Sequence, residues 1–537
     1  PTTTNLILLN CAGILPFKQN HIYLLADTRI MLNDNRDIYL FAAIASMLIS
    51  AWSVFADPII NHDGVQYLLA ANDFAAGRFN EGISLFKWPT YAISIALVSK
   101  LTPLGVENSA HLLNALLFAS LVCGFLFTVR TLGGTRSTLI FAAILLLLFP
   151  SLNKFRPFVI RDAGYLSFYV WALGFLFVHC RTQGFRPLLA AAVSLTIAGL
   201  FRIEAFAIMA MIPIILLGTR ASSTWQKRWF WLAGAIVVCV MCIGLALWVF
   251  GAESRIPLQT FKSNPLDSTA QIIGQVWQQI TFRLDTIRYE FLTEFSGDFA
   301  PTVLVVTLLI MVAYESLRRL AFVYAVLAWH AWYRKLVFQQ SAVRHFWQLL
   351  LLAHLVLLTA FTFSKMFIAS RYTMALVLTV LVAAPFSIEH FYNRWRTRDK
   401  NKNVRIGFPV LVVIISLLGI DSLDLWTDKR YVRDAGQWVN TNSEPSARLY
   451  SNSHIVMHYA GRDALRSGRL FNWQETMLLA GQLEWRTYDY FALQFEVDHL
   501  DRKNRFQATV GLTPVKVFAN SEGDQVAVYQ TPLKLRL

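Results

Sequence analysis

Residues 39–91 read YLFAAIASMLISAWSVFADPIINHDGVQYLLAANDFAAGRFNEGISLFKWPTY, and they join an apolar run of membrane-spanning length to a charged loop. The apolar run ends at Phe55, and the loop extends from Asn61 to Tyr91. The ionisable side chains of this loop include Asp63, Asp73, Arg78, Glu81 and Lys87. Ionisable groups beside a membrane are typical of proteins that bind or move something there. We therefore expect this loop to form part of a functional site.

The same apolar character continues through the chain. Of its 537 residues 55% are hydrophobic, and the mean hydropathy is +0.46. Further candidate spans are residues 110–129, 139–149, 163–180, 188–201, 205–217, 229–250, 301–317, 346–363, 373–388 and 408–420. Together these runs predict a polytopic α-helical membrane protein with about eleven transmembrane helices.

The basic residues are distributed unevenly along the chain. Residues 421–537 contain 14 Lys and Arg against 14 Asp and Glu, so the net charge of +15 belongs to the first 420 residues. The predicted topology places the most basic loops on one side, which the positive-inside rule makes the cytoplasm. These loops lie near residues 130–136, 181–186, 220–228, 334–344 and 392–405. This distribution favours membrane lipids over nucleic acid as partners.

The topology divides the chain into three parts. Residues 1–30 lack the basic start and the cleavage site of a good signal peptide, and we predict an N-terminal extension that the fold does not need. Residues 31–420 are predicted to be the transmembrane catalytic domain, and residues 421–537 a small mixed α/β domain outside the membrane. The predicted outer loops are residues 58–107, 153–162 and 251–300. We expect a multi-pass protein of the bacterial inner membrane, with its active site and C-terminal domain facing the periplasm.

Local patterns add some secondary structure. Apolar residues at helical spacing predict two interfacial helices in the first outer loop, at residues 65–76 and 89–98. In the C-terminal domain, the patterns predict an amphipathic helix at 429–440 and strands at 448–451, 515–518 and 525–529. The last two strands are expected to be joined by a turn at 520–524.

The first candidate site residues lie in the predicted helix of the first outer loop. Asp63 and Tyr67 are four residues apart and therefore lie on one helical face. A carboxylate there suits a general base, and the alternative is that Asp63 only caps the helix. His62 beside Asp63 leaves a divalent metal open, although no spaced ligand set accompanies it. No residue is predicted as a metal ligand, and no cofactor is certain.

The second outer loop reads NKFRPFVIRDAGY from Asn153 to Tyr165. Arg156 and Arg161 are cations on the predicted outer side, against the general trend, and a bound phosphate would explain them. Asp162 and Tyr165 open the next span. The alternative is a local charge balance between Arg161 and Asp162.

Two further pairs of residues interrupt or flank apolar segments. Arg202 and Glu204 in GLFRIEAF interrupt a strongly apolar region, where a charged side chain needs a buried partner. A structural ion pair and a substrate contact would each provide such a partner, and they fit the sequence equally well. Lys87 in FKWPTY and Arg371 in SRYT lie at the outer ends of apolar helices. These two cations fit either snorkelling anchors or phosphate ligands.

In this order the motifs resemble those of the GT-C glycosyltransferases, nearest to the branches of the protein O-mannosyltransferases and the lipid A aminoarabinose transferase. The shared features are Asp63 before Tyr67, Lys87-Trp88-Pro89, Arg161-Asp162-x-x-Tyr165, Arg371-Tyr372 and an outer C-terminal domain. The likeness covers nearly the whole chain in architecture, through short motifs. The sequence departs from the family at Gly64, where an acidic residue is common, and at Trp88, where Lys-Pro-Pro is common.

The resemblance implies a glycosyltransferase that moves a sugar from a polyprenyl-phosphate-linked donor to an acceptor hydroxyl of a glycan, lipid or protein, with inversion. Asp63 and Asp162 would be its catalytic carboxylates, and Asp63 is the better candidate for the base. The residues expected to contact the donor phosphate or substrate are Tyr67, Lys87, Arg156, Arg161, Tyr165, Arg202, Glu204, Arg371 and Tyr372. Two other functions remain open, namely a polysaccharide polymerase or ligase and a lipid-linked sugar transporter or flippase.

Overall fold

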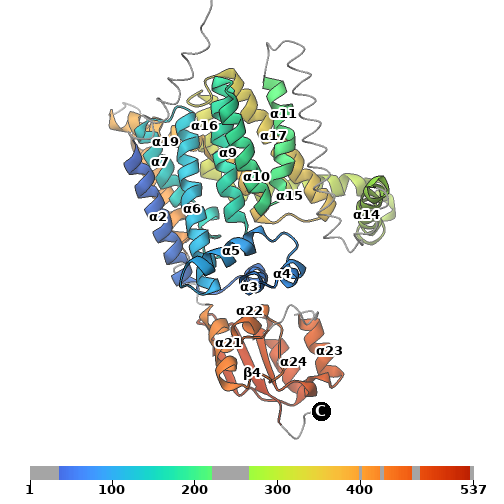
Figure 1. Ribbon diagram of the computed structural model, residues 1–537. Helices are drawn as coiled ribbons and strands as arrows, with labels where there is room; N and C mark the ends of the chain where they lie inside the picture. The colour runs from blue at the N-terminus through green and yellow to red at the C-terminus, as the bar shows by residue number, and fades with distance from the viewer. Residues whose placement is uncertain (1–34, 220–264, 398–401, 424–428, 463–471, 533–537) are drawn as a thin grey trace, which may run out of the picture.

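The computed structural model describes residues 35–219, 265–397, 402–423, 429–462 and 472–532 (Figure 1). Helices dominate the first 421 residues, and a four-stranded sheet lies in the C-terminal part. The predicted extension at residues 1–30 and the predicted span at residues 229–250 lie outside the described residues.

The helical part begins with α2 (Arg36–Ala56), which leads into the first outer loop. The loop folds into α3 (His62–Ala75), α4 (Phe79–Leu85) and α5 (Thr90–Leu101). The bundle continues with α6 (Val106–Thr131), α7 (Arg136–Leu147), α8 (Pro150–Asn153), α9 (Asp162–Thr182), α10 (Phe185–Phe201) and α11 (Glu204–Thr219). Its second half comprises α14 (Pro265–Thr286), the π-helix η1 (Ile287–Phe291), the 3₁₀ helix η2 (Glu294–Phe299), α15 (Ala300–Leu320), α16 (Phe322–Tyr333), α17 (Ser341–Lys365), the 3₁₀ helix η3 (Ser370–Thr373), α18 (Met374–Leu381), α19 (Ala384–Arg396) and α20 (Lys402–Asp421).

Helix α9 is the centre of the bundle. It packs along α6 on one side and α10 on another, and it also touches α17 and α18 (Figure 1). The approach to α6 is close because Gly174 faces Phe127, and a Cβ atom at position 174 would lie 2.6 Å from the ring. A glycine at this position therefore lets two long apolar helices pack with little space between them.

Five described helices are long and apolar enough to cross a membrane, namely α2, α6, α9, the η2–α15 segment and α17. A sixth span is formed if η3–α18 and α19 are taken together, with a bend of 42° between them. Three further predicted spans correspond to α7, α10 and α11, which are apolar but shorter. The described part of the chain is thus mostly helical and contains candidate membrane-spanning helices, while the number of about eleven stays a prediction.

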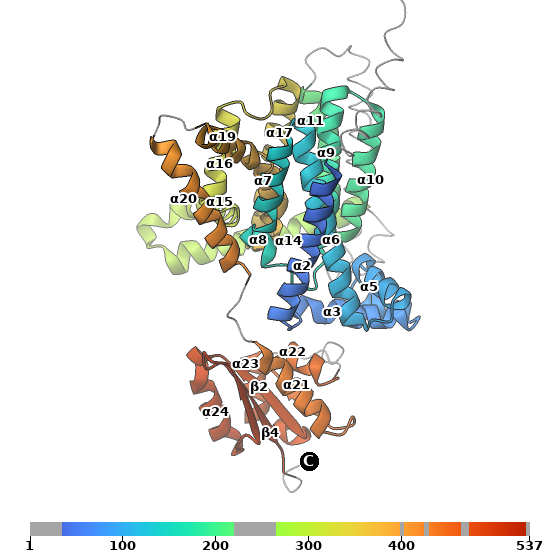
Figure 2. The same cartoon turned by 90° about the vertical axis from the view of Figure 1, so that its left-hand side faces the viewer.

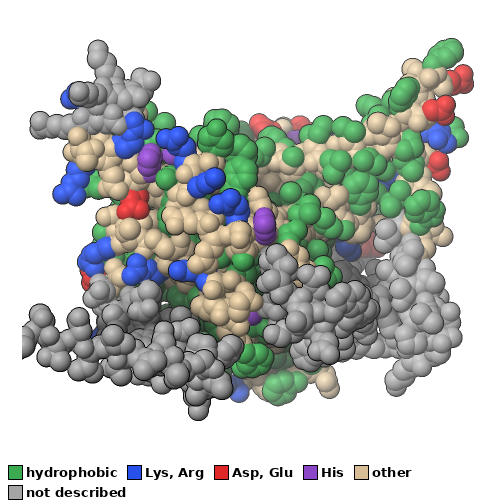
Figure 3. Space-filling view, turned by 90° about the horizontal axis from the view of Figure 1, so that it is seen from above, with side chains coloured by type: hydrophobic (Ala, Val, Ile, Leu, Met, Phe, Trp, Pro, Cys, Tyr) green, Lys and Arg blue, Asp and Glu red, His purple; other side chains and the backbone are tan. Residues whose placement is uncertain are grey.

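One end of the bundle is rich in basic side chains. Arg136 at the start of α7 pairs with Asp37 at the start of α2, and Arg181 at the end of α9 donates to the Thr131 carbonyl at the end of α6. These contacts place the ends of four helices together. Lys and Arg side chains gather over part of this end of the molecule, seen from above in Figure 3. The C-terminal domain lies beyond the opposite end of the bundle (Figure 1).

The C-terminal domain has three layers, with helices on both faces of one sheet. The strands β1 (Leu449–Ser451), β2 (Tyr490–Phe495), β3 (Lys516–Ala519) and β4 (Gln525–Gln530) take the order β1-β2-β4-β3, in which only the β1–β2 pair is parallel. Alternate residues of β4 face opposite sides, as the pleat requires. Val526 and Val528 pack with α21 (Arg430–Asn442), while Ala527 and Tyr529 lie in the core beside α24 (Leu500–Val510).

Most local predictions for this domain are confirmed. Helix α21 and strands β1, β3 and β4 lie at the predicted places, and Asn520 accepts and donates hydrogen bonds with Asp524 in the turn between β3 and β4. The central strand β2 was not predicted. The chain also forms α22 (His454–Tyr459), α23 (Trp473–Gly481) and the 3₁₀ helices η5 (Glu484–Thr487) and η6 (Val497–His499).

The first outer loop lies between the bundle and the C-terminal domain (Figures 1 and 2). Its two predicted helices are confirmed as α3 and α5, and α4 is an additional short helix between them. Helix α22 packs against α3, so the C-terminal domain touches the loop directly. This arrangement places α3 at the junction of the two parts of the protein.

Candidate active site

An ion pair joins two candidate residues from opposite ends of the helical part of the sequence, Asp63 and Arg371. Nη1 of Arg371 in η3 lies 2.5 Å from Oδ2 of Asp63 in the first turn of α3. Both side chains are partly open to solvent, with 33% of Arg371 and 40% of Asp63 exposed. A carboxylate that is held by a cation and still reachable can accept a proton from an incoming group.

The start of α3 is fixed by its neighbours. The Asn61 side chain accepts a hydrogen bond of 2.7 Å from the backbone N–H of Val159, which lies in the loop before α9. A Cβ atom at Gly64 would lie 2.7 Å from the Asn61 Oδ1 atom and 2.8 Å from an Ile60 carbon. A side chain at position 64 would therefore collide with Asn61 and Ile60 unless they moved.

A second, buried group of charges is centred on Arg202. This residue lies in extended backbone between α10 and α11. Its guanidinium contacts Asp162, the first residue of α9, and makes a two-point contact with Glu204, the first residue of α11. Only 3% of Arg202 and 5% of Asp162 are exposed. Burial alone would lower the pKa of Arg202, but the Asp162 and Glu204 carboxylates raise it well above its ordinary value.

Two tyrosines connect these groups. The Arg202 guanidinium lies 4.6 Å from the centre of the Tyr372 ring, and the Arg371 guanidinium lies 5.8 Å from the same centre. Tyr165, one turn after Asp162, also faces Arg202 at 5.8 Å. We call the seven residues that these contacts unite the charged cluster: Asp63, Asp162, Tyr165, Arg202, Glu204, Arg371 and Tyr372.

Arg161 and Tyr67 border the charged cluster. The Arg161 guanidinium lies 5.1 Å from the centre of the Phe86 ring, and within the described residues no carboxylate forms an ion pair with it. Phe86 in turn packs edge-on against Tyr67 at 4.8 Å. Burial raises the pKa of Tyr67 to about 12, so its hydroxyl stays neutral. Arg161 thus forms no ion pair within the described part of the chain, although its charge acts on the nearby Glu204 carboxylate.

Two candidate residues do not join this group. Arg156 is 1% exposed and donates to the Ser46 carbonyl at 3.0 Å and to the Ser50 hydroxyl at 2.7 Å, so it ties the second outer loop to α2. Burial lowers its pKa to about 9. Lys87 is exposed, while its neighbour Trp88 packs against Phe206. Neither cation is in contact with Asp63 or Arg371.

The structure does not form the Arg161–Asp162 pair that was considered as the alternative for the second outer loop. Asp162 pairs with Arg202 instead, and the Arg161 guanidinium lies on the Phe86 ring. The ion pair considered for Arg202 and Glu204 is present. Sequence reasoning missed Asn61 and Phe86 because apolar and amide side chains carry no charge signal, although both directly precede residues that were singled out.

The C-terminal domain contacts the start of α3 and the residues just before it. The Tyr459 hydroxyl accepts from the backbone N–H of Ile60 at 3.0 Å and also lies 3.2 Å from a Glu107 oxygen. The His454 ring meets the His62 ring edge-on, with centroids 4.3 Å apart, and His62 directly precedes Asp63. Burial first, and the nearby His62 second, lower the pKa of His454 to about 4. Helix α22 therefore packs against the helix turn that carries Asp63 and supports its position.

The described residues offer no built metal site. No group of three or more His, Cys, Asp or Glu side chains among them is placed to hold a metal ion. Asp63 and Asp162 each contact an arginine instead.

Comparisons with known proteins give a distant structural likeness. Neither the family models nor the curated proteins contain a match. Among solved structures, the chain is similar to the crystal structure of the Archaeoglobus fulgidus oligosaccharyltransferase in complex with zinc and sulfate, with a TM-score of 0.46 and 13% sequence identity. The match covers 82% of this chain and 64% of that chain, so this chain spans less than two thirds of its length. The function is therefore argued from the geometry of the described residues.

Proposed function

We propose that this protein is an integral membrane glycosyltransferase that moves a sugar from a polyprenyl-phosphate-linked donor to an acceptor hydroxyl. The observation that carries the proposal is the pairing of partly exposed Asp63 with Arg371, together with the nearby Arg161, which forms no ion pair among the residues that the structure describes. A transfer of this kind needs a carboxylate base for the acceptor and cations for the leaving phosphate. The charged cluster and its border contain both.

The proposed reaction is a single displacement. The acceptor oxygen attacks the anomeric carbon, its proton goes to the Asp63 carboxylate, and the bond from that carbon to the phosphate oxygen breaks with its electron pair on the phosphate. Inversion at the anomeric carbon follows. Arg371 and Arg161 are proposed to bind the phosphate, because guanidinium groups suit phosphate oxygens and form strong charge-assisted hydrogen bonds.

The Asp63–Arg371 contact suggests how donor binding prepares the base. A donor phosphate would compete with Asp63 for the Arg371 guanidinium. When Arg371 turns toward the phosphate, one oxygen of Asp63 loses its partner and can accept the acceptor proton. Asp63 would then be able to act as the base only after the donor is bound.

The buried half of the charged cluster has a different proposed role. Asp162 and Glu204 neutralise Arg202 in a site closed to solvent, and a carboxylate engaged in this way is poorly placed to receive a proton. Arg202 faces the Tyr372 ring, which follows Arg371 in sequence. We therefore assign Asp162 and Arg202 as positioning residues that fix η3, with Tyr165 and Glu204 beside them.

The proposed orientation follows the charge distribution. The basic end of the bundle would face the cytoplasm, and the charged cluster, with the C-terminal domain, would face the outside of the cell membrane, which is the periplasm in a bacterium with two membranes. A lipid-linked donor could then reach the site from the outer leaflet. The acceptor, a glycan, lipid or protein, would approach from the side of the C-terminal domain.

A second function is favoured by one observation. The span that begins with η3 is bent by 42° between α18 and α19, and broken helices beside a polar site are typical of transporters. A lipid-linked sugar flippase would use the charged cluster to pass a phosphate and would leave the sugar–phosphate bond intact. This alternative predicts an unchanged lipid-linked sugar on the wrong side of the membrane when the protein is absent.

One experiment distinguishes the two functions. Lipids and glycans of a deletion strain are analysed by mass spectrometry, together with the sidedness of the lipid-linked sugar as measured by a membrane-impermeant oxidant. The transferase proposal predicts that the lipid-linked sugar accumulates on the outer leaflet while one sugar disappears from an acceptor. Accumulation on the inner leaflet would support the flippase, and unchanged lipids and glycans would contradict both.

A further inference from the structure

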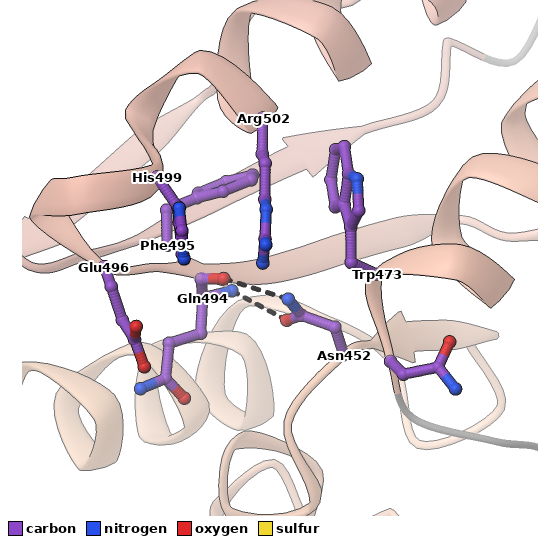
Figure 4. Close-up of a pocket in the computed structure, with 8 residues that line it drawn as sticks. Asn452, Trp473, Gln494, Phe495, Glu496, His499 and Arg502 are labelled. Atoms are coloured by element: carbon purple, nitrogen blue, oxygen red, sulfur yellow. Dashed lines mark hydrogen bonds between the residues drawn. The ribbon is translucent and has the colours of Figure 1, made fainter. Parts of the chain in front are cut away.

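A pocket of about 310 Å³ lies in the C-terminal domain, apart from the charged cluster (Figure 4). Its walls combine the aromatic rings of Trp473 and Phe495 with side chains that donate and accept hydrogen bonds. The residues that matter most here are Asn452, Trp473, Gln494, Glu496, His499 and Arg502. Nothing in the proposed reaction uses these groups.

The fold builds the pocket at one edge of the sheet. Strands β1 and β2 are parallel, so their carboxyl ends lie together, and ligands of α/β proteins commonly bind beyond such ends. Asn452 follows β1 and is locked to the backbone of Gln494 by two hydrogen bonds, of 2.9 and 2.8 Å. Helices α23 and α24 both begin at the pocket, with Trp473 the first residue of α23. The floor is therefore rigid, while the rim carries longer side chains.

The two charged side chains at the rim, Arg502 and Glu496, do not pair with each other. Within the described residues, the Arg502 guanidinium and the Glu496 carboxylate form no ion pair or side-chain hydrogen bond, although both line the same pocket. Arg502 instead lies 5.9 Å from the centre of the Trp473 ring, and Trp473 packs edge-on against Phe495 at 6.3 Å. Figure 4 shows Arg502 pointing between His499 and Trp473 into the pocket. A cation and an anion thus line one pocket beside the Trp473 ring without pairing to each other, whereas the Gln494 side chain turns away and donates to the Tyr431 hydroxyl at 3.4 Å.

We propose that this pocket binds a saccharide, namely the glycan part of the acceptor. Sugars present hydroxyls that both donate and accept, so a pocket lined by the Arg502 guanidinium and the Glu496 carboxylate suits a sugar better than a purely anionic ligand. Their C–H faces pack on aromatic rings, which Trp473 provides. The volume is at the lower end of small-molecule sites, so it fits one or two sugar units of a longer chain.

The position of the pocket connects it to the charged cluster. Asn452 is two residues before His454, which contacts His62 beside Asp63. The sheet edge that holds the pocket is thus the edge from which α22 reaches α3. A glycan held there would be presented on the side of the domain that touches the first outer loop. This role of the pocket as an acceptor site rests on the proposed transferase function, whereas saccharide binding itself does not.

Binding is tested with the purified full-length protein in detergent. The probe is the oligosaccharide fraction released by mild acid from the host's cell-surface polysaccharide, labelled with a fluorophore, and binding is read by fluorescence polarisation. Trp473→Ala and Arg502→Gln are expected to weaken binding by at least about tenfold. Trp438→Ala is the matched control, because Trp438 packs on Phe518 outside the pocket and should leave binding unchanged. Glu496→Gln, at an exposed residue, provides a variant whose folding is not at risk.

The outcomes separate this inference from the proposed function. No binding of the probe by the wild-type protein, equal binding by the pocket variants, or competition by an unstructured peptide in place of the saccharide would each overturn the saccharide site. Asp63→Asn protein should bind the probe normally. If it does so but retains transfer, the catalytic proposal fails and the pocket stands. If it loses transfer while the pocket variants bind normally, only the pocket inference fails.

Discussion

Arg371 donates a hydrogen bond of 2.5 Å to Asp63, although 308 residues separate them in the sequence. The contact joins the first outer loop to the start of a late span, so both halves of the bundle must be folded before it can form. Neither residue is deeply buried, in contrast to the Asp162–Arg202 pair beside them. One ion pair is thus accessible to a ligand, and the other is part of the packed interior. This difference underlies the predictions that follow.

The phosphate-binding role is tested at Arg371 and Arg161. Arg371→Ala removes a charge-assisted contact and should raise the donor concentration needed for half-maximal transfer by about tenfold to a hundredfold. Arg371→Lys should recover part of this loss, because Lys keeps the charge without the planar fork. Arg161→Ala should act in the same direction. Lys100→Ala, at an exposed residue at the end of α5, is the control that leaves donor dependence unchanged.

The positioning role of the buried pair is tested by stability. Asp162→Asn leaves Arg202 with one carboxylate in a closed site, and breaking a buried ion pair typically costs about 3–5 kcal/mol. The melting temperature of the purified protein should fall clearly. Asp37→Asn is the matched control, since its pair with Arg136 is more than half exposed on both sides and such pairs contribute about 0–1 kcal/mol. Equal melting temperatures for the two variants would contradict a structural role for Asp162.

The contact between α22 and α3 should depend on pH. The pKa of His454 is lowered from 6.5 to about 4, so the unfolded chain binds the proton at His454 more readily than the folded one. The stability from this group is therefore complete above pH 6.5 and is lost as the pH falls from 6.5 toward 4. Thermal unfolding followed between pH 4 and 8 should show this loss in the wild type, and His454→Gln should show less of it. An identical pH profile for both proteins would speak against the assignment to His454.

The topology is tested by cysteine labelling. Glu522→Cys lies in the exposed turn of the C-terminal domain, and Gln339→Cys lies in the exposed loop between α16 and α17 at the basic end. In an otherwise cysteine-free protein in intact cells, a membrane-impermeant thiol reagent should label the first and not the second. Labelling of Gln339→Cys alone would place the charged cluster in the cytoplasm and exclude an outer-leaflet donor for this site.

Much of the candidate site could be predicted from the sequence, because charges in apolar surroundings are conspicuous. Asp63, Asp162, Arg202 and Arg371 were each singled out in this way, and they lie together in the structure. The pairing between them could not be predicted. Asp162 has Arg161 beside it in the chain, but the i,i+1 neighbours of a helix start point in different directions, and the distant Arg202 takes the contact.

The fold was predictable to a similar degree. Long apolar runs and amphipathic patterns located α2, α6, α9 and α21, since these follow from local periodicity. Strand β2 was missed because the nearly continuous apolar run from Tyr490 to Phe495 lacks the alternation of a half-exposed strand, and no short turn joins it to a neighbouring strand as one joins β3 to β4. The contact of His454 with His62 could also not be predicted from the sequence, since it depends on how the C-terminal domain packs on α3.

The account depends most directly on Asp63 as the base, and one measurement decides it. Transfer is measured with purified Asp63→Asn protein and membranes that contain the accumulated lipid-linked donor, beside the wild type and Glu81→Gln, whose exposed carboxylate lies in the same outer loop. The substitution keeps size and removes basicity, and loss of a general base typically costs 10²- to 10⁴-fold in rate. The account predicts a loss of this size for Asp63→Asn, with donor binding retained, and near-normal rates for Glu81→Gln. A near-normal transfer rate for Asp63→Asn would contradict it.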